Sequence, residues 1–94
     1  MNLQIEARHW TILKGIFHKY PYKFYAYGSR VKKQAKQYSD LDLCYQEEIP
    51  LNILSHIRED FEESNLPFSI DLVAWNWMSP EFQELIKKDL TVIS

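Results

Sequence analysis

Residues 39–46, SDLDLCYQ, sort their side chains into two alternating sets. Side chains two positions apart on a β-strand point to the same face of the sheet, and such alternation is typical of a half-exposed strand. The acidic set therefore predicts one polar face, and the apolar set predicts a face that other elements must cover. The first set holds Asp40, Asp42 and Cys44, and the second holds Leu41, Leu43 and Tyr45.

Two further segments are typical of strands. Residues 22–29, YKFYAYGS, are aromatic and β-prone and end in a tight turn at Gly28. Residues 68–75, FSIDLVAW, form the third predicted strand. The closing residues 91–94 are consistent with a small strand or a tail.

Four segments are typical of helices. Apolar residues recur at steps of three and four from Leu3 to Tyr20, and Pro21 stops this pattern. Residues 30–38 contain good helix formers and no breaker. The other two predicted helices begin near prolines: one opens at Pro50 with Leu51, Leu54, Ile57 and Phe61 on one side, and one opens at Ser79-Pro80-Glu81 and runs to about Lys88.

Helices and strands thus alternate along the chain. This order predicts an α/β fold, with a small mixed sheet of three to four strands and helices packed on it. The 94 residues suffice for one domain, 1–94, and not for two. The strand order is left open.

Composition narrows the class of protein. A hydrophobic content of 46% and a net charge of −2 indicate a globular chain with no overall field that would attract nucleic acid. A single cysteine excludes an internal disulfide and suits a reducing compartment. No apolar run approaches the roughly 18 residues of a membrane span, and no signal-peptide pattern opens the chain, so we expect a cytoplasmic protein.

Three acids are candidate metal ligands. Asp40 and Asp42 share a strand face, where two carboxylates repel each other unless a cation intervenes. Asp71 lies among apolar residues of another predicted strand, where an isolated charge would be costly. If the two strands are neighbours, the three acids converge. Such a set suits Mg²⁺, which is bound by few carboxylates together with water and substrate phosphates.

A turn precedes these acids at a fixed distance. Gly28 permits close backbone approach, and Ser29 offers a hydroxyl and an amide at the start of the predicted helix 30–38, an arrangement suited to phosphate oxygens. Arg30 follows directly, and we expect it to contact phosphate. Ten residues then separate Ser29 from Asp40.

This set resembles the pattern of the nucleotidyltransferase superfamily, whose fold is shared by DNA polymerase beta, aminoglycoside nucleotidyltransferases and the minimal nucleotidyltransferase antitoxins. Its Gly-Ser, spacer, Asp-X-Asp and later acid are matched by Gly28, Ser29, Asp40, Asp42 and Asp71. The resemblance implies Mg²⁺-dependent transfer of a nucleoside monophosphate, most simply AMP from ATP, onto a hydroxyl. It implies two Mg²⁺ ions on Asp40 and Asp42, with Asp71 ligating one and helping to activate the acceptor.

One position departs from the resemblance. Minimal members often carry Gly-Ser-Arg-Ala-Arg-Gly, whereas this chain has Gly-Ser-Arg-Val-Lys-Lys, with Lys33 in place of the second glycine. In the minimal group the partner is typically a helical HEPN toxin, an RNase neutralised by nucleotide transfer, so the resemblance implies an antitoxin with a HEPN partner.

Other interpretations remain open at this stage. Asp40 and Asp42 alone could be a solvated strand face, and the basic residues 30–36 an exposed helix face. The protein could also neutralise its partner by contact, without catalysis, or modify a small molecule such as an antibiotic. A homo-oligomer is possible, since the 15% aromatic content would suit an interface.

Overall fold

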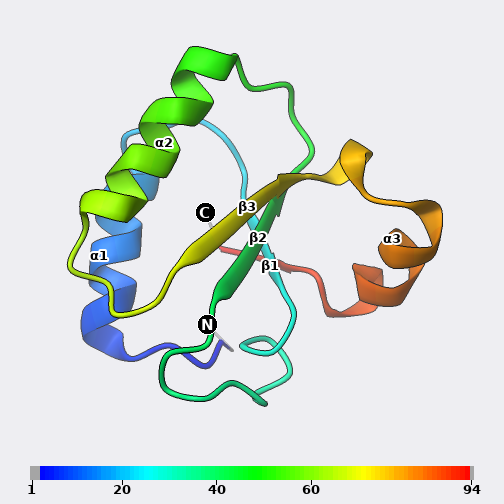
Figure 1. Cartoon of the computed structure of the whole chain (residues 1–94), viewed down its shortest axis with the longest axis horizontal. Helices are drawn as coiled ribbons and strands as arrows, with labels where there is room; N and C mark the ends of the chain where they lie inside the picture. The colour runs from blue at the N-terminus through cyan, green and yellow to red at the C-terminus, as the bar shows by residue number, and fades with distance from the viewer. Residues whose placement is uncertain (1–2, 94) are drawn as a thin grey trace.

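The sheet is mixed and lies at the centre of the computed structural model, which describes residues 3–93 (Figure 1). Its strands are β1 (Tyr25–Tyr27), β2 (Leu41–Tyr45), β3 (Ile70–Ala74) and β4 (Thr91–Val92), in the order β3-β2-β1-β4. β2 and β3 are parallel, whereas β1 is antiparallel to both of its neighbours. The predicted α/β fold and all three predicted strands are confirmed; residues 91–92 form the small fourth strand, and Ser94 lies outside the described residues.

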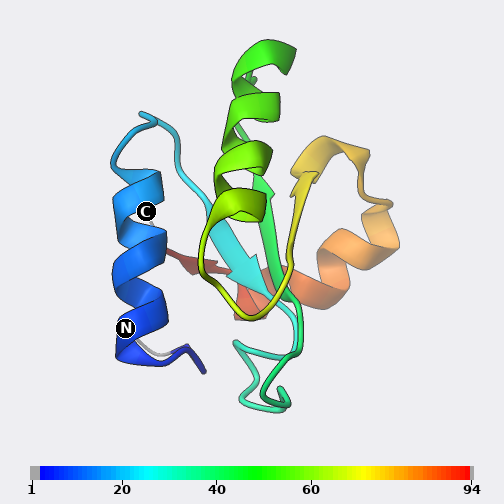
Figure 2. The same cartoon turned by 60° about the vertical axis from the view of Figure 1, so that its left-hand side comes forward.

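Two helices cover one face of the sheet. α1 (Ala7–Phe17) and α2 (Leu51–Glu63) lie side by side against it in both views (Figures 1 and 2). Their contribution to the main core is Leu13, Ile16, Phe17, Leu54, Ile57 and Phe61, which pack with Ala26, Leu41, Leu43 and Leu72 of the strands. The apolar set of β2 thus faces the helices, as the alternation predicts.

A shorter helix covers part of the opposite face. β3 leads through the 3₁₀ turn η1 (Trp75–Trp77) into α3 (Pro80–Ile86), which is followed by the 3₁₀ turn η2 (Lys87–Asp89). Figure 2 shows α3 across the sheet from α1 and α2. The Ser79 hydroxyl accepts a hydrogen bond from the Phe82 amide at 3.2 Å, so the predicted helix start is confirmed. Ile86 packs with Tyr27 and Cys44 in a second, smaller core cluster.

The first helix is shorter than predicted. α1 begins at Ala7 rather than near Leu3 and ends at Phe17. The reason is tertiary, because the Gln4 amide donates to the Arg30 carbonyl at 3.0 Å and holds this segment against a distant loop. The periodicity extends beyond the helix because Leu3 and Tyr20 still pack against the core.

The predicted helix over residues 30–38 is wrong. This segment is a series of turns, in which the Gly28 carbonyl accepts from the amides of Val31 and Lys32 and the Ser29 carbonyl accepts from the amide of Gln34.

The prediction that Leu51 lies on the apolar side of its helix is also wrong. It opens α2 but is 82% exposed, because the first turn of the helix does not reach the core. None of the helices in residues 3–93 has the length and apolar character required to cross a membrane.

Candidate functional site

Two of the three predicted acids meet on the sheet. Asp42 of β2 lies directly opposite Asp71 of β3 in the parallel register. Both project away from α1 and α2, because their neighbours Leu41, Leu43 and Leu72 face those helices. Neighbouring strands are about 4.8 Å apart, so the two carboxylates share one small region. The predicted adjacency of the two strands is confirmed.

The pKa of the Asp42 carboxyl is raised above its ordinary value. Partial burial raises the pKa of its carboxyl, and the negative charges of Asp71 and then Asp40 raise it further. A shift of this kind identifies a place where added positive charge would be stabilising. Asp71 itself is exposed, so the expectation of a buried charge was wrong. Its side chain lies on the open face of the sheet, where water solvates it.

Asp40 lies at the edge of this region. It precedes β2 by one residue rather than belonging to the strand, and it is exposed. Its charge still acts on Asp42. Within residues 3–93, no group of three or more His, Cys, Asp or Glu side chains is arranged to hold a metal ion by itself. The protein therefore offers a close pair, Asp42 and Asp71, with Asp40 nearby.

Gly28 lies next to the Asp42 carboxylate. Its φ of 84° lies in the left-handed region that glycine adopts without strain. A Cβ built at this position would overlap the Asp42 Oδ2 atom. The Asp42 carboxylate thus lies directly against the backbone of the Gly28 turn, which explains why a glycine precedes Ser29.

Arg30 is not placed as predicted. The residue is only 5% exposed, and its guanidinium lies over the Phe68 ring, 4.1 Å from the ring centroid. Nε and Nη2 donate to the Ser39 carbonyl at 3.0 and 2.7 Å, and Nη1 donates to the Gln4 carbonyl at 2.7 Å. All three nitrogens are thus engaged with protein, Nη2 additionally with the Gln37 carbonyl at 3.3 Å. The side chain shapes the loop, and this geometry does not support the expected contact with phosphate.

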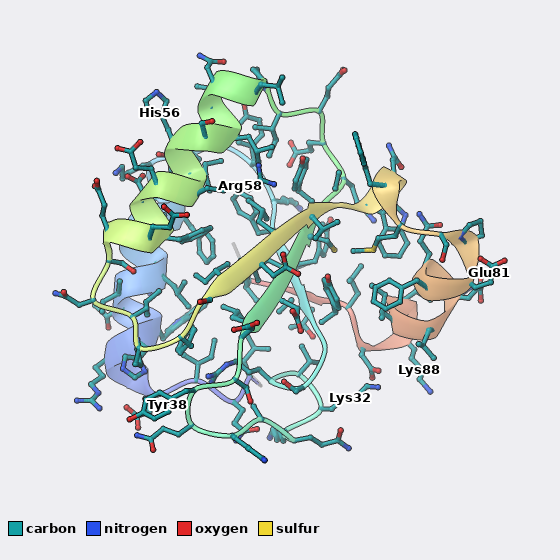
Figure 3. All side chains as sticks on the ribbon, viewed as in Figure 1. Lys32, Tyr38, His56, Arg58, Glu81 and Lys88 are labelled. Atoms are coloured by element: carbon teal, nitrogen blue, oxygen red, sulfur yellow. The ribbon has the colours of Figure 1, made fainter. Side chains whose placement is uncertain are left out.

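Gln4 holds the same loop from outside. Its side-chain amide donates to the Ala35 carbonyl at 2.8 Å, and its side-chain oxygen accepts from the Ala35 amide at 3.0 Å. The sequence provided no signal for this role, because the two residues are 31 positions apart. Figure 3 shows Lys32 and Tyr38 on opposite sides of this loop.

Lys33, the sixth residue of the Gly-Ser-Arg-Val-Lys-Lys stretch, has an unusual backbone conformation. Lys33 has a φ of 59°, the one positive value among the described non-glycine residues. This is the position at which minimal nucleotidyltransferases often carry glycine. Lys33 therefore adopts a backbone conformation that glycine would adopt without strain. Ser29, half-buried, lies between Gly28 and this turn and does not open a helix.

Three further residues, Cys44, Trp77 and Arg58, have structural roles or lie away from the acid pair. Burial raises the pKa of the Cys44 thiol to about 11, in keeping with a small core residue. Trp77 is 88% exposed, but it borders a cavity of about 760 Å³ formed by the ends of β2, β3 and α2 rather than the acid face. Arg58, which lines the same cavity and lies between α2 and β3 in Figure 3, donates to the Leu72 carbonyl at 2.9 Å.

Three comparisons relate this chain to known proteins. Residues 12–94 match the family described as polymerase beta, nucleotidyltransferase. The chain is 42% identical over 96 aligned positions to the "Probable protein adenylyltransferase MntA" of Haemophilus influenzae, covering 98% of this chain and 84% of the relative. The structural match to a crystal structure from Sulfolobus solfataricus, described as a nucleotidyltransferase, covers 89% of this chain and 74% of that protein's chain. The two chains are 16% identical, and the TM-score of 0.48 is too low to support an argument.

The chain therefore belongs to the polymerase beta nucleotidyltransferase family and is an enzyme of that class. Its identity to the MntA relative over nearly the whole chain makes it a domain of the minimal nucleotidyltransferase type.

Proposed function

We propose that this enzyme transfers AMP from ATP to a hydroxyl of a partner protein, with Mg²⁺, as the antitoxin of a HEPN-type toxin. The observation that carries the proposal is the pairing of Asp42 with Asp71 across β2 and β3, directly against the Gly28 turn. The description of the MntA relative as a protein adenylyltransferase supports a protein as acceptor.

The residues fit a divalent cation bound together with its substrate. Asp42 is half-buried beside a second carboxylate, and burial and neighbouring charge both raise its pKa, so a cation would relieve the repulsion. Because only two carboxylates are close, the remaining ligands would be phosphate oxygens and water, as Mg²⁺ favours. When bound, Mg²⁺ would neutralise charge that develops on the phosphates.

The transfer itself requires one bond to form and one to break. The acceptor oxygen bonds to the α-phosphorus, the bond from that phosphorus to the bridging oxygen breaks, and pyrophosphate leaves. We assign the acceptor proton to Asp71, because its exposed carboxylate is open to an incoming hydroxyl. Asp42, Asp71 and Asp40 are assigned to the metal, so that Asp71 both ligates the cation and takes the proton, and Gly28 and Ser29 are assigned to the phosphates.

A protein acceptor also suits the open acid face. α3 covers the part of this face near Tyr27 and Cys44, whereas Asp71 remains exposed. Orientation of the hydroxyl supplies much of the rate in such reactions. A docked partner would supply the hydroxyl, orient it and exclude water in one step.

The test is incubation of the chain with α-labelled ATP, Mg²⁺ and the product of the neighbouring gene, followed by intact-mass measurement of both proteins. We expect one or more AMP units on the partner, and none with Asp42→Asn or Asp71→Asn. Glu63→Gln, which removes an exposed acid at the end of α2, is the matched control and should transfer normally.

Two other outcomes would replace the proposal. Neutralisation of the partner without added mass would identify an antitoxin that acts by contact. Transfer to an added aminoglycoside, with an unmodified partner, would identify a small-molecule transferase.

A further inference from the structure

β3 is an edge strand of the sheet. Among residues 3–93 it pairs with β2 alone, and Figure 2 shows it as the outermost strand on its side. The Ser69 carbonyl accepts from the Leu41 amide at 2.9 Å, so every second residue from position 69 directs its backbone groups to β2. The residues between them direct their amides and carbonyls to the free edge. These residues are Ile70, Leu72 and Ala74.

A side chain of α2 reaches this free edge. Arg58 donates to the Leu72 carbonyl at 2.9 Å, which confirms that this carbonyl points outward. A carbonyl oxygen has two lone pairs, so it can accept from a second donor as well. Within residues 3–93, the hydrogen bonds outside the helices and strands include none from the outward amides of Ile70, Leu72 and Ala74. The edge therefore keeps the donors and acceptors that a further strand would use.

Two cavities follow the free edge. One, of about 760 Å³, is lined by Leu72 and Ala74 and lies between α2 and η1. The other, of about 400 Å³, is lined by Ile70 at the start of the strand. Arg58 lines both cavities, so together they form one groove along β3, here called the β3 groove.

The rim of the β3 groove exposes two large apolar side chains. Leu51 of α2 is 82% exposed and Trp77 of η1 is 88% exposed, the highest values among the large hydrophobic residues that the structure describes. Both line the cavity that runs beside Leu72 and Ala74. Apolar side chains that flank free backbone groups are typical of a binding surface for a peptide segment.

The charge of the β3 groove is acidic. Arg58 is the one cation among its described lining residues. The acids that line it are all exposed: Glu47, Glu48 and Glu62. A segment that carries basic side chains beside apolar ones would therefore complement the groove.

We propose that an extended segment of the partner protein, with apolar and basic side chains, binds in the β3 groove as a fifth strand of the sheet. The inference rests on the proposed function, because the segment belongs to the protein that accepts AMP. Main-chain hydrogen bonds to the outward groups of β3 supply affinity, and the rim selects the side chains of the segment.

This docking sets the acceptor beside Asp71. Asp71 belongs to β3 itself, and its side chain is exposed on the face away from α1 and α2. Side chains of neighbouring strands that share a face have Cβ atoms about 4.5–5.5 Å apart. A hydroxyl side chain on the same face of the added strand thus lies next to the Asp71 carboxylate. Strand register, rather than a separate pocket, then orients the acceptor.

The first test measures amide exchange of the wild-type chain by nuclear magnetic resonance, with and without the product of the neighbouring gene. The outward amides of Ile70, Leu72 and Ala74 should exchange more slowly in the complex, by about tenfold or more. The amides of Asp71 and Val73 already bond to β2 and serve as the internal reference. Unchanged exchange of the three outward amides in a formed complex would overturn the inference.

The second test removes one outward amide. Ala74 has a φ of −70°, which proline adopts without strain, so Ala74→Pro deletes the N–H and keeps the backbone. Ala74→Ser keeps the N–H and is the matched control. We expect Ala74→Pro to bind the partner about tenfold more weakly and to keep the melting shift with Mg²⁺ and an ATP analogue. If the proline disturbs folding, Trp77→Ala replaces it, with the exposed Leu85→Ala of α3 as control.

The outcomes separate this inference from the proposed function. Equal partner binding by Ala74→Pro and wild type would overturn the inference and leave the proposed function standing. A wild-type chain that binds the partner without transferring AMP would overturn the proposed function, whereas slowed exchange of the outward amides would still support the β3 groove. A dimer of the chain alone that Ala74→Pro dissociates in sedimentation would assign the groove to a second copy and overturn the inference.

Discussion

At the scale of single residues, the charge of Asp42 that the proposed function requires lowers the stability of the ligand-free protein. Its carboxyl is half-buried and lies opposite Asp71, and its pKa is raised by burial and by the two neighbouring acids. A raised carboxyl pKa means that the folded state favours the protonated form. The stabilisation of that form is complete below the unfolded pKa and is lost as pH rises through the folded pKa.

Asp42→Asn should therefore raise the melting temperature of the ligand-free protein at neutral pH. The amide keeps the shape of the side chain and removes its charge. The difference from wild type should shrink as pH falls below the ordinary carboxyl range, because wild-type Asp42 is then protonated as well. Thermal melts across this pH range measure it. A variant less stable than wild type at neutral pH would show that Asp42 stabilises the fold.

Lys33 is strained at a position that the resembling pattern fills with glycine. A left-handed conformation costs a non-glycine residue roughly 1–2 kcal/mol, whereas glycine adds about 0.4–1 kcal/mol of unfolded-state entropy. Lys33→Gly should therefore stabilise the protein by up to about 1.6 kcal/mol, as the difference of these two effects. Denaturant melts provide the measurement.

The matched control is Lys32→Gly, one residue earlier, where φ is not positive. It should destabilise by about 0.5–1 kcal/mol, because it adds only entropy to the unfolded chain. If both variants lost stability equally, the positive φ of Lys33 would carry no strain.

At the scale of elements, the loop between β1 and β2 depends on Arg30. The buried guanidinium binds the carbonyls of Gln4, Gln37 and Ser39, which would otherwise lack these donors. Burial lowers the pKa of Arg30, and the charge of Asp40 partly offsets this. One long side chain therefore donates to loop carbonyls that, in a helix, would accept hydrogen bonds from backbone amides.

Arg30→Met should destabilise the protein by roughly 2–3 kcal/mol, because it leaves carbonyls without a charged donor. Nucleotide affinity should fall only as far as the loop loses its shape. Lys32→Met, an exposed change in the same loop, is the control and should be near neutral. A stable Arg30→Met protein that fails to bind nucleotide would restore the predicted phosphate contact.

The elements predictable from sequence are those set by local pattern. The alternation of residues 39–46 and the caps at Ser79 and Pro80 lie close together in the chain, so the strand β2 and the start of α3 could be predicted. The loop could not, because Gln4 and Arg30 act on it across the fold and Lys33 adopts a backbone that its type disfavours.

In the candidate site, too, the sequence predicts what local pattern sets and does not predict what the tertiary structure sets. Asp42 and Asp71 could be predicted, because their strands are each apolar apart from one acid and their spacing after Gly28 fits a known pattern. The exposure of Asp71 was missed because the sequence does not show which face α3 leaves open.

At the scale of the whole molecule, ligand binding should be visible as global stability. A ligand that binds only the folded state stabilises it by an amount set by its concentration relative to its Kd. The acid pair is a source of repulsion in the absence of a cation. Nucleotide and Mg²⁺ together should remove this repulsion, whereas either alone should do so less well, because the protein supplies only two close carboxylates.

The last prediction is a shift in melting temperature with Mg²⁺ and a non-hydrolysable ATP analogue. At ten times Kd the stabilisation is about 1.4 kcal/mol, which for a domain of this size corresponds to roughly 6–11 °C. Asp42→Asn should start from a higher ligand-free melting temperature and show almost no shift, so the two proteins should exchange their order of stability as ligand is added. Glu63→Gln should keep the full shift, because it lies on α2 and away from the acid face. An equal shift in Asp42→Asn would mean that nucleotide and cation bind elsewhere on the molecule, and the pairing of Asp42 with Asp71 would then be a feature of the sheet alone.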